Sequence, residues 1–244
     1  MIRVSVAMVT YNGEKYVREQ LDSILASIGE QDEVVISDDG SRDGTLQILK
    51  EYTERESRIK ILEGPGKGIK ANVDYVLRAC NGKYIFLADQ DDIWEKNKVC
   101  TVLDAFVSTG SGVVVHDAVV VKEDGQTVML DSFYRQRHSG RGVLKNIWRN
   151  TYIGCCMAFR RELLEYVLPI PDTIEMHDQW IGVISDLTGE GASFLQEKLL
   201  YYRRHEENQS SMHHYGIRKM LHNRIILIQE LKARRKQLRE GMNY

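Results

Sequence analysis

Three carboxylates follow directly on a short apolar run in this chain. The run, residues 84–88, reads as a buried strand, because it is short, apolar and preceded by an Asn-Gly turn. On a continuing strand, Asp89 and Asp91 would share a face, and Asp92 would follow them. Two adjacent oxygen donors with open positions suit Mg²⁺ or Mn²⁺ bridging to substrate phosphates. An acidic turn that caps the following helix is the alternative, and it remains open.

Polar residues also follow the first two predicted strands. Thr10, Tyr11 and Asn12 follow the first strand, and Asp38 and Asp39 follow the second. In a parallel sheet these ends meet at one edge, where ligands bind. A carboxylate at Asp38 or Asp39 matches the N3–H donor of uracil or thymine, and Tyr11 offers a ring for the base. A structural turn at the two Asp residues is the alternative.

A glycine-rich loop, residues 64–68, follows the third predicted strand. Its position and spacing differ from those of a dinucleotide-binding fingerprint, so a Rossmann cofactor site is not expected. Asn72 lies one turn inside the next helix. It either reaches the nucleotide or is a polar surface residue, and the sequence does not separate the two.

Two further candidates lie in the second half of the chain. Asp178 follows His177 at the start of a predicted helix, where an Asp is either a cap or a catalytic acid–base group. His205 follows the last predicted strand. A neutral imidazole there would complete a site whose other ligands are carboxylates, although a lone histidine is often structural.

The elements that must position these residues alternate between strand and helix in the first half. This alternation is typical of a parallel, doubly wound α/β sheet. Asn12 is expected to cap the first helix. The expected strands are 2–10, 34–37, 59–62 and 84–88, and helices are expected at 14–28, from about 45, and from 69 to 80.

The second half is less regular. A mobile loop is expected at 131–142, because that segment is rich in Arg, His and Ser. Expected helices are 95–109, 144–150 and 178–187, and expected strands are 113–121, 127–130 (a hairpin partner), 157–160 and 199–203.

A long helix is expected from residue 216 onward, with apolar and basic residues on different faces. Such a helix either lies on a membrane or an acidic partner, joins two subunits, or packs on its own domain. Its expected apolar stripe is Ile217, Leu221, Ile225, Ile228 and Leu231, and its expected basic face is Lys219, Lys232, Arg234, Lys236 and Arg239.

Composition narrows the classes of protein. The 244 residues suit one large α/β domain, and a net charge of −2 argues against a nucleic-acid-binding protein. No apolar run approaches a membrane span, and the first residues already show a strand pattern rather than a signal peptide. Four scattered cysteines fit reduced thiols. A cytoplasmic protein is expected, with any membrane contact peripheral and at the inner face.

Four motifs in order resemble family 2 glycosyltransferases of the GT-A fold, over roughly residues 2–208. The residue sequence of the carboxylate motif and the later histidine motifs looks most like that of the bacterial rhamnosyltransferase branch. The motifs are Thr10-Tyr11-Asn12, Asp38-Asp-Gly-Ser-x-Asp-Gly-Thr45, Gly68 with Asn72, and Asp89-x-Asp-Asp-x-Trp94, followed by His177-Asp178 and His205-x-x-Asn208.

The resemblance implies a Rossmann-like, mostly parallel central sheet flanked by helices. It implies that residues 1–94 form the nucleotide-sugar half and 95–208 the acceptor half of one domain, with a helical extension at 209–244. It further implies inverting sugar transfer from a nucleoside diphosphate donor. In such an enzyme Asp91, with Asp89, would hold a divalent cation (Mn²⁺ or Mg²⁺), and His205 would touch the metal or the diphosphate.

The resemblance also implies that Asp178 is the general base, although His177 stands where most of the family has an acid. The expected donor is a dTDP- or UDP-sugar, with rhamnose as the candidate sugar, and the expected acceptor is a hydroxyl of a growing glycan, free or lipid-linked. Two other classes remain open: a sugar-1-phosphate nucleotidyltransferase and a non-catalytic nucleotide-sugar-binding protein. A nucleotidyltransferase would need a Gly-rich basic loop after the first strand, and a non-catalytic binding protein would need no general base.

Overall fold

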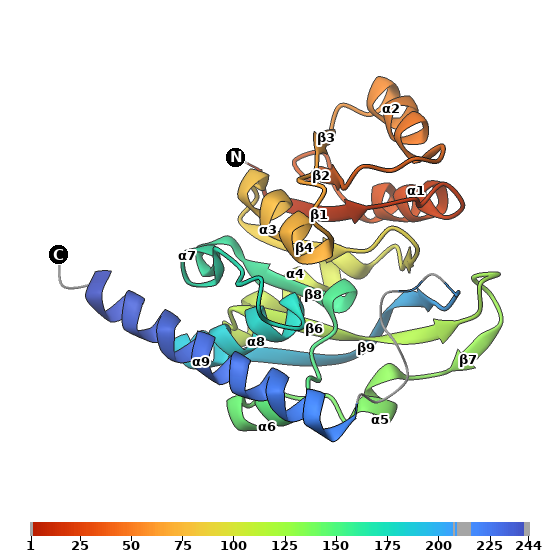
Figure 1. Cartoon of the computed structure of the whole chain (residues 1–244). Helices are drawn as coiled ribbons and strands as arrows, with labels where there is room; N and C mark the ends of the chain where they lie inside the picture. The colour runs from red at the N-terminus through yellow and green to blue at the C-terminus, as the bar shows by residue number, and fades with distance from the viewer. Residues whose placement is uncertain (1, 207, 209–215, 242–244) are drawn as a thin grey trace.

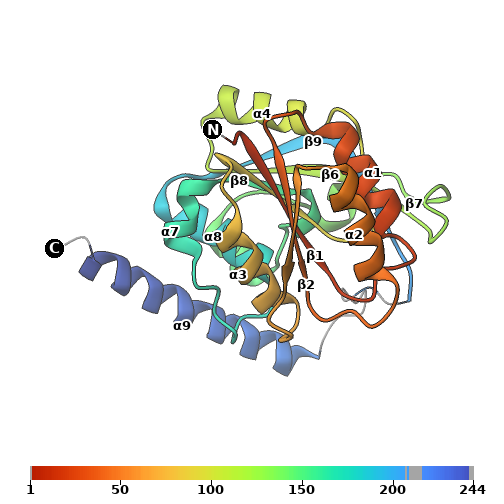
Figure 2. The ribbon, with the colours of Figure 1, turned by 90° about the horizontal axis from the view of Figure 1, so that it is seen from above.

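The N-terminal half forms four parallel strands in the order β3-β2-β1-β4. We describe a computed structural model, which covers residues 2–206, 208 and 216–241. Helices α1 and α2 lie on one side of β1 and β2, and α3 lies on the other (Figure 2). The elements are β1 (Val4–Thr10), α1 (Val17–Ser27), β2 (Glu33–Asp38), α2 (Thr45–Arg55), β3 (Ile59–Glu63), α3 (Ile69–Ala79) and β4 (Tyr84–Ala88).

The second half extends the same sheet through β8, β6, β9 and β5, and β7 pairs with β6 (Figure 1). Strand β8 runs antiparallel to β4 and β6, whereas β6 and β9 are parallel to each other. The elements are β5 (Ile93–Trp94), α4 (Lys98–Thr109), β6 (Val113–Val121), β7 (Val128–Leu130), α5 (Phe133–Arg137), α6 (Val143–Trp148), β8 (Met157–Arg160), α7 (Leu164–Val167), α8 (His177–Thr188), β9 (Ala192–Arg203) and α9 (Ile217–Gly241), with 3₁₀ turns at Gly154–Cys156 and Arg161–Leu163.

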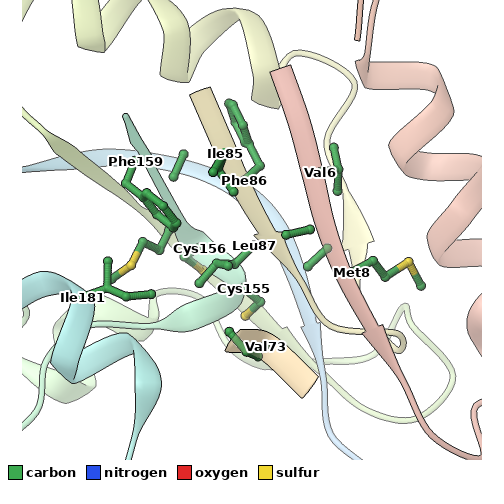
Figure 3. Packing of buried hydrophobic residues seen from close by; sticks show 14 of the residues in the cluster. Val6, Met8, Val73, Ile85, Phe86, Leu87, Cys155, Cys156, Phe159 and Ile181 are labelled. Atoms are coloured by element: carbon green, nitrogen blue, oxygen red, sulfur yellow. The ribbon is translucent and has the colours of Figure 1, made fainter. Parts of the chain in front are cut away.

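The predicted fold is confirmed: a mostly parallel α/β sheet flanked by helices, followed by a C-terminal helix. Strands β1, β2 and β4 are almost wholly buried, as expected for parallel strands covered on both faces. The core continues across the junction of the two halves, where Leu87 of β4 belongs to the same buried cluster as Cys155, Cys156 and Ile181 of the second half (Figure 3).

Several local predictions were wrong. Asn12 does not cap α1; its backbone is left-handed (φ 49°) and its side chain accepts a hydrogen bond from Arg42 N at 2.8 Å. Segment 131–142 is not simply a loop, because it contains α5, whose Phe133 and Tyr134 are buried. The short strand β5 was not predicted, and β9 begins seven residues before the expected strand at 199.

Helix α9 packs on its own domain, but only part of the predicted apolar stripe faces that domain. Leu231 of the stripe is buried, together with Leu227 and Arg234 from outside it, whereas Leu221 and Ile225 of the stripe are exposed. The side chain of Ile217 lies outside the described residues, as does segment 209–215 beside the predicted domain boundary, which stays a prediction. Within the described ranges, no helix is long and apolar enough to cross a bilayer.

Candidate active site

The carboxyl ends of β1 and β2 are joined through Thr10 and Asp38, which are paired in register. Thr10 Oγ1 donates to Asp38 Oδ2 at 2.8 Å, and Ser41 donates to the same carboxylate through both its backbone N–H and its hydroxyl. Gly40 N donates to Asp38 Oδ1 as well, and Asp38 is buried. With four donors on one buried carboxylate, Asp38 shapes the loop and has little capacity left for a ligand.

Asp39 has more open bonding capacity than Asp38. Its two carboxylate oxygens accept from Gly66 N at 2.8 Å and Gly68 N at 2.7 Å, one bond to each oxygen. It is half-buried, and Gly68 adopts φ 85°, which favours glycine. Asp39 therefore fixes the glycine-rich loop and keeps free lone pairs at the rim.

Loops after β1 and β4 are joined by Gln90, which the sequence did not single out. Its amide oxygen accepts from Tyr11 N at 2.8 Å and its amide nitrogen donates to Tyr11 O at 3.0 Å. The Tyr11 ring itself is 51% exposed. Gln90 thus fixes the backbone at Tyr11 while leaving an aromatic face open to a ligand.

Asn72 faces inward rather than toward the rim. Its amide nitrogen donates to Ser37 O at 2.9 Å, and its amide oxygen accepts from the Ser37 hydroxyl at 2.6 Å. Asn72 is buried, so these bonds tie α3 to β2. They give Asn72 a structural role, and its predicted contact with a nucleotide gains no support from them.

The backbone bends at the carboxylate motif, since β4 ends at Ala88 and no strand continues through Asp89 and Asp91. The two residues therefore do not share a strand face as expected. Asp91 Oδ2 instead contacts His205 Nε2 at 2.7 Å and accepts from Asn208 Nδ2 at 3.0 Å. The segment after β9 is thereby folded over the motif.

His205 is held from several sides. Its ring stacks on Tyr16 of the turn before α1, with 4.5 Å between ring centroids. Its backbone N–H donates to Asn208 Oδ1 at 2.7 Å, while Asn208 Nδ2 lies 3.1 Å from His205 Nε2. These contacts fix Nε2 against Asp91. His205 and Asp91 are 114 positions apart in sequence, so only the fold brings them together.

The groups around Asp91 fit a divalent cation. Two ligands at right angles on one ion, each about 2.1 Å from it, are separated by roughly 3 Å, close to the distance between Asp91 Oδ2 and His205 Nε2. Among the described residues, no hydrogen bond reaches Asp91 Oδ1. An added positive charge would also relieve the repulsion of clustered carboxylates.

That repulsion is visible at Asp89. Burial, and then the neighbouring charges of Asp91 and Asp178, raise the pKa of Asp89 to about 7, against a smaller opposing effect of Lys98. Because the charge of Asp178 contributes to the raised pKa of Asp89, Asp178 lies close to the carboxylate motif. The three carboxylates thus share one electrostatic environment at the carboxyl edge of the sheet.

A second group of ligand-type atoms lies beneath the motif, formed by Asp89, Asp92 and Cys155. Lys98 is buried beside it, with Nζ donating to Cys155 O at 2.8 Å and standing 3.7 Å from the Trp94 ring centroid. Burial lowers the pKa of Lys98 to about 8. This buried cation already compensates the cluster, so we do not assign a metal there.

Arg203 at the end of β9 fixes the loop that carries the motif. Its Nε donates to Asp91 O at 2.8 Å, and its backbone N–H donates to Asp92 Oδ1 at 3.1 Å. Its guanidinium also donates to Glu123 O at 2.7 Å and pairs with Glu19. One buried arginine therefore joins β9, α1, the β6–β7 turn and the motif loop.

Asp178 lies in the first turn of α8 and is buried. Its Oδ1 accepts from Asn150 Nδ2 at 3.0 Å and from Gln179 N at 2.6 Å, and Oδ2 accepts from Gly154 N at 3.2 Å. Burial lowers the pKa of the adjacent His177, which keeps that imidazole neutral. Asp178 is thus held as a hydrogen-bond acceptor, without a cationic histidine beside it.

From the sequence, no role was predicted for Gln90, Asn150 and Arg203, and Asn208 was quoted only as part of the motif with His205. Gln90 stands between two predicted site residues, and Asn208 follows His205 by three positions, so proximity in sequence was a usable signal for both. Asn150 had no such signal, because its contact with Asp178 spans 28 positions. The other predicted roles at the rim stay predictions.

Comparison with known proteins identifies the same scaffold. The sequence model described as glycosyl transferase family 2 matches residues 5–168. An uncharacterized glycosyltransferase of Nostoc, alr2836, is 27% identical over 85% of this chain and 66% of its own length. The dTDP-rhamnosyl transferase RfbG of Shigella flexneri is 28% identical over 83% of this chain and 73% of its own length. TuaG of Bacillus subtilis, named for teichuronic acid biosynthesis, is 27% identical over 82% and 78%.

Two solved structures share the fold. TarS of S. aureus, crystallised with UDP-GlcNAc, aligns with a TM-score of 0.69 and 22% identity, covering 93% of this chain and 66% of that one. Mannosyltransferase PcManGT of Pyrobaculum calidifontis, in complex with GDP-Man and Mn²⁺, aligns with a TM-score of 0.65 and 21% identity, covering 84% and 58%. The chain thus spans about two thirds or less of these two proteins.

Proposed function

Because the chain belongs to glycosyl transferase family 2, we propose that it transfers a sugar, with inversion, from a nucleoside diphosphate donor to a hydroxyl of a growing cell-surface glycan. The observation that carries this proposal is the meeting of the Asp91–His205 pair with Asp178 around Asp89 at one sheet edge. The first pair suits a cation-bound diphosphate, and Asp178 suits an acceptor hydroxyl.

On the donor side, Asp91 and His205 hold the divalent cation in this proposal, with Asp89 beside them. Bound there, Mn²⁺ or Mg²⁺ supplies Lewis-acid stabilisation of the departing diphosphate. Arg203 keeps the backbone of Asp91 in place. The base stacks on the exposed ring of Tyr11, and Asp39 accepts the N3–H of a uracil or thymine.

On the acceptor side, Asp178 takes the proton of the attacking hydroxyl. The hydroxyl oxygen bonds to the anomeric carbon as the bond to the diphosphate breaks, which inverts that centre. Asn150 and Gly154 fix the orientation of the carboxylate through their N–H groups. A neutral His177 leaves the base without a competing ion pair.

A dTDP- or UDP-sugar is the donor we propose, and rhamnose is its candidate sugar. The relative RfbG is a dTDP-rhamnosyl transferase, and the neighbour TarS was crystallised with UDP-GlcNAc. Both nucleotides carry the N3–H donor that Asp39 would accept. We further propose a cytoplasmic site of action, since all four cysteines are free thiols and three of them are buried.

The test is a panel of nucleotide sugars incubated with the protein, Mn²⁺ and glycan acceptors, with products read by mass spectrometry. Release of nucleoside diphosphate together with a glycosylated acceptor supports the proposal. In a separate incubation with a nucleoside triphosphate and a sugar 1-phosphate, release of pyrophosphate would point to a nucleotidyltransferase instead. Binding without any turnover, even with lipid-linked acceptors, would leave the non-catalytic class.

Asp178→Asn is the matched variant in that assay. Loss of the positioned base predicts a fall in turnover of about 10²–10⁴, with donor affinity nearly unchanged. The amide keeps the size of the side chain but only one of the two acceptor oxygens that Asn150, Gln179 and Gly154 bond to. A purely structural role therefore predicts a joint loss of folding and donor binding. That result, or near-normal turnover, would contradict the assignment of the base.

A further inference from the structure

Four large apolar side chains are exposed on two helices that lie side by side, α6 and α9 (Figure 1). We call them the α6–α9 patch: Leu144 (84% exposed) and Trp148 (66%) on α6, and Leu221 (47%) and Ile225 (55%) on α9. Each pair is spaced four residues apart, so its two members share one face of their helix. Contiguous exposed apolar side chains mark an interaction surface.

The two helices are held together by Arg224. Its guanidinium donates to Trp148 O at the end of α6, and its carbon Cζ lies 4.7 Å from the centroid of the Trp148 ring. The opposite face of α9 is committed to the domain through Leu227, Leu231 and Arg234. The patch is therefore the remaining, outward face of a docked helix.

Basic residues surround this patch. Helix α9 contains eight Lys and Arg residues against two Glu, and segment 131–149 contains five against one Asp, in a chain of net charge −2. The α6–α9 patch thus lies on elements with a marked excess of positive charge. Exposed basic residues of the two elements include Arg141, Lys145, Arg149, Arg218, Lys232 and Arg235.

We propose that the α6–α9 patch docks the protein on an anionic lipid bilayer. Apolar side chains with an aromatic ring enter the interface, while the surrounding lysines and arginines meet acidic headgroups. A second copy of this chain fits less well, since an isologous contact would bring two basic surfaces face to face.

The position of the patch fits the proposed function, on which this inference partly rests. Trp148 precedes Asn150 by two residues, and Asn150 donates to Asp178. Gln179, next to Asp178, donates through Nε2 to Asn146 O of α6 at 2.5 Å. One short helix therefore carries exposed apolar side chains outside and supports the base inside. A bilayer at the patch would present a lipid-linked acceptor to the acceptor side of the site.

The experiment is vesicle flotation of the full chain at low salt, with vesicles of phosphatidylglycerol and phosphatidylcholine or of phosphatidylcholine alone. We expect flotation with the anionic vesicles, little with the neutral ones, and release as salt is raised. The double variant Leu144→Glu/Ile225→Glu should bind anionic vesicles at least tenfold more weakly. The matched control is Val107→Glu, an 80% exposed residue of α4, on the opposite side of the molecule from α9 (Figure 2).

Two results would overturn the proposal: failure of the wild type to float with anionic vesicles, or flotation of the double variant like the wild type. Sedimentation analysis of the wild type and the double variant tests the alternative that a second copy of this chain binds the patch. A wild-type dimer that the double variant loses, without vesicle binding, would make the patch a subunit interface instead. Transfer to a water-soluble acceptor should be unchanged in the double variant, so its loss would indicate damage to the enzyme rather than to docking.

Discussion

The two oxygens of Asp91 have different environments, and this difference decides how the residue can act. Oδ2 faces His205 and Asn208, whereas among the described residues nothing bonds to Oδ1. A carboxylate that is held on one side and open on the other is positioned before its ligand arrives. Too few groups of the described residues converge there to enclose an ion, so in the proposed mechanism a substrate phosphate would complete its coordination.

Asp91→Asn should therefore remove most turnover, because a neutral amide is a poor ligand for Mn²⁺ or Mg²⁺. A fall of about 10²-fold or more is expected, since the variant loses the stabilisation of the leaving group. Activity of the wild type should vanish in excess chelator and return with added Mn²⁺. The control is Asp104→Asn, an exposed carboxylate on α4. Full wild-type activity in chelator would rule out the metal role.

In the proposed mechanism, Asn150 orients the base Asp178 without touching the reacting atoms. Asn150→Ala removes a side-chain donor to Asp178 Oδ1, so the carboxylate loses one of the hydrogen bonds that fix its orientation. We expect kcat to fall about tenfold while the KM for the donor changes little, since misplacement of a catalytic group acts on the chemical step. Asn150→Gln, which keeps an amide, tests partial rescue. An equal change in donor KM would show that the loop, not the base, had been disturbed.

At the residue scale, the sequence predicted which side chains lie at the sheet edge but not how they are bonded. Asp38, Asp39 and Asp91 were found because polar residues after buried strands must meet at one rim. That rule does not distinguish a saturated carboxylate from an open one. Nor did it show that Asn72 is buried, because its partner Ser37 lies 35 positions away.

Helix α9 shows how an element can be predicted correctly while its buried face is predicted only in part. Apolar spacing selected Leu231, which is buried, but also Leu221 and Ile225, which are exposed, and it left out the buried Arg234. The Arg234 guanidinium donates to the backbone oxygens of Tyr166, Leu168 and Pro169, and it lies 5.3 Å from the centroid of the Trp180 ring. A hydropathy pattern assigns arginine to the surface. It therefore does not predict a buried guanidinium that donates to three carbonyls.

Arg234→Ala should weaken the docking of α9 and lower the free energy of unfolding by about 1–3 kcal/mol, because it removes a buried guanidinium that donates to three partly buried carbonyls. Arg235→Ala is the matched control, one residue along and exposed, with an expected change within about 0.5 kcal/mol. Urea unfolding of both variants decides the matter. Equal values for the two would mean that the contacts of Arg234 contribute nothing net.

For the whole molecule, the buried cation Lys98 predicts how stability depends on pH. Its pKa is lowered from 10.5 to about 8 in the folded protein. Between those values the unfolded chain binds more protons than the folded one, so this residue makes stability rise with pH through that window. Below pH 8 the full cost of burying the charge is present, roughly 3 kcal/mol for such a shift.

Lys98→Met removes this titration, so the stability of the variant relative to the wild type should decline as pH rises from 8 toward 10.5. Urea unfolding of both proteins across that range measures the difference, in which the titrations that they share cancel. A difference that does not change with pH would show that Lys98 is not buried as a cation.

The sheet order also sets when the site can exist. Strand β9 pairs with both β6 and β5, and His205 at its end meets Asp91 across 114 positions. A ribosome that has released residues 1–94 has delivered every predicted nucleotide-side loop, but neither Asp178 nor His205. Domains form as their residues emerge, N-terminal parts first. The half-made chain therefore carries unmatched carboxylates and an incomplete site, and the proposed transfer needs a chain that has been synthesised past residue 208.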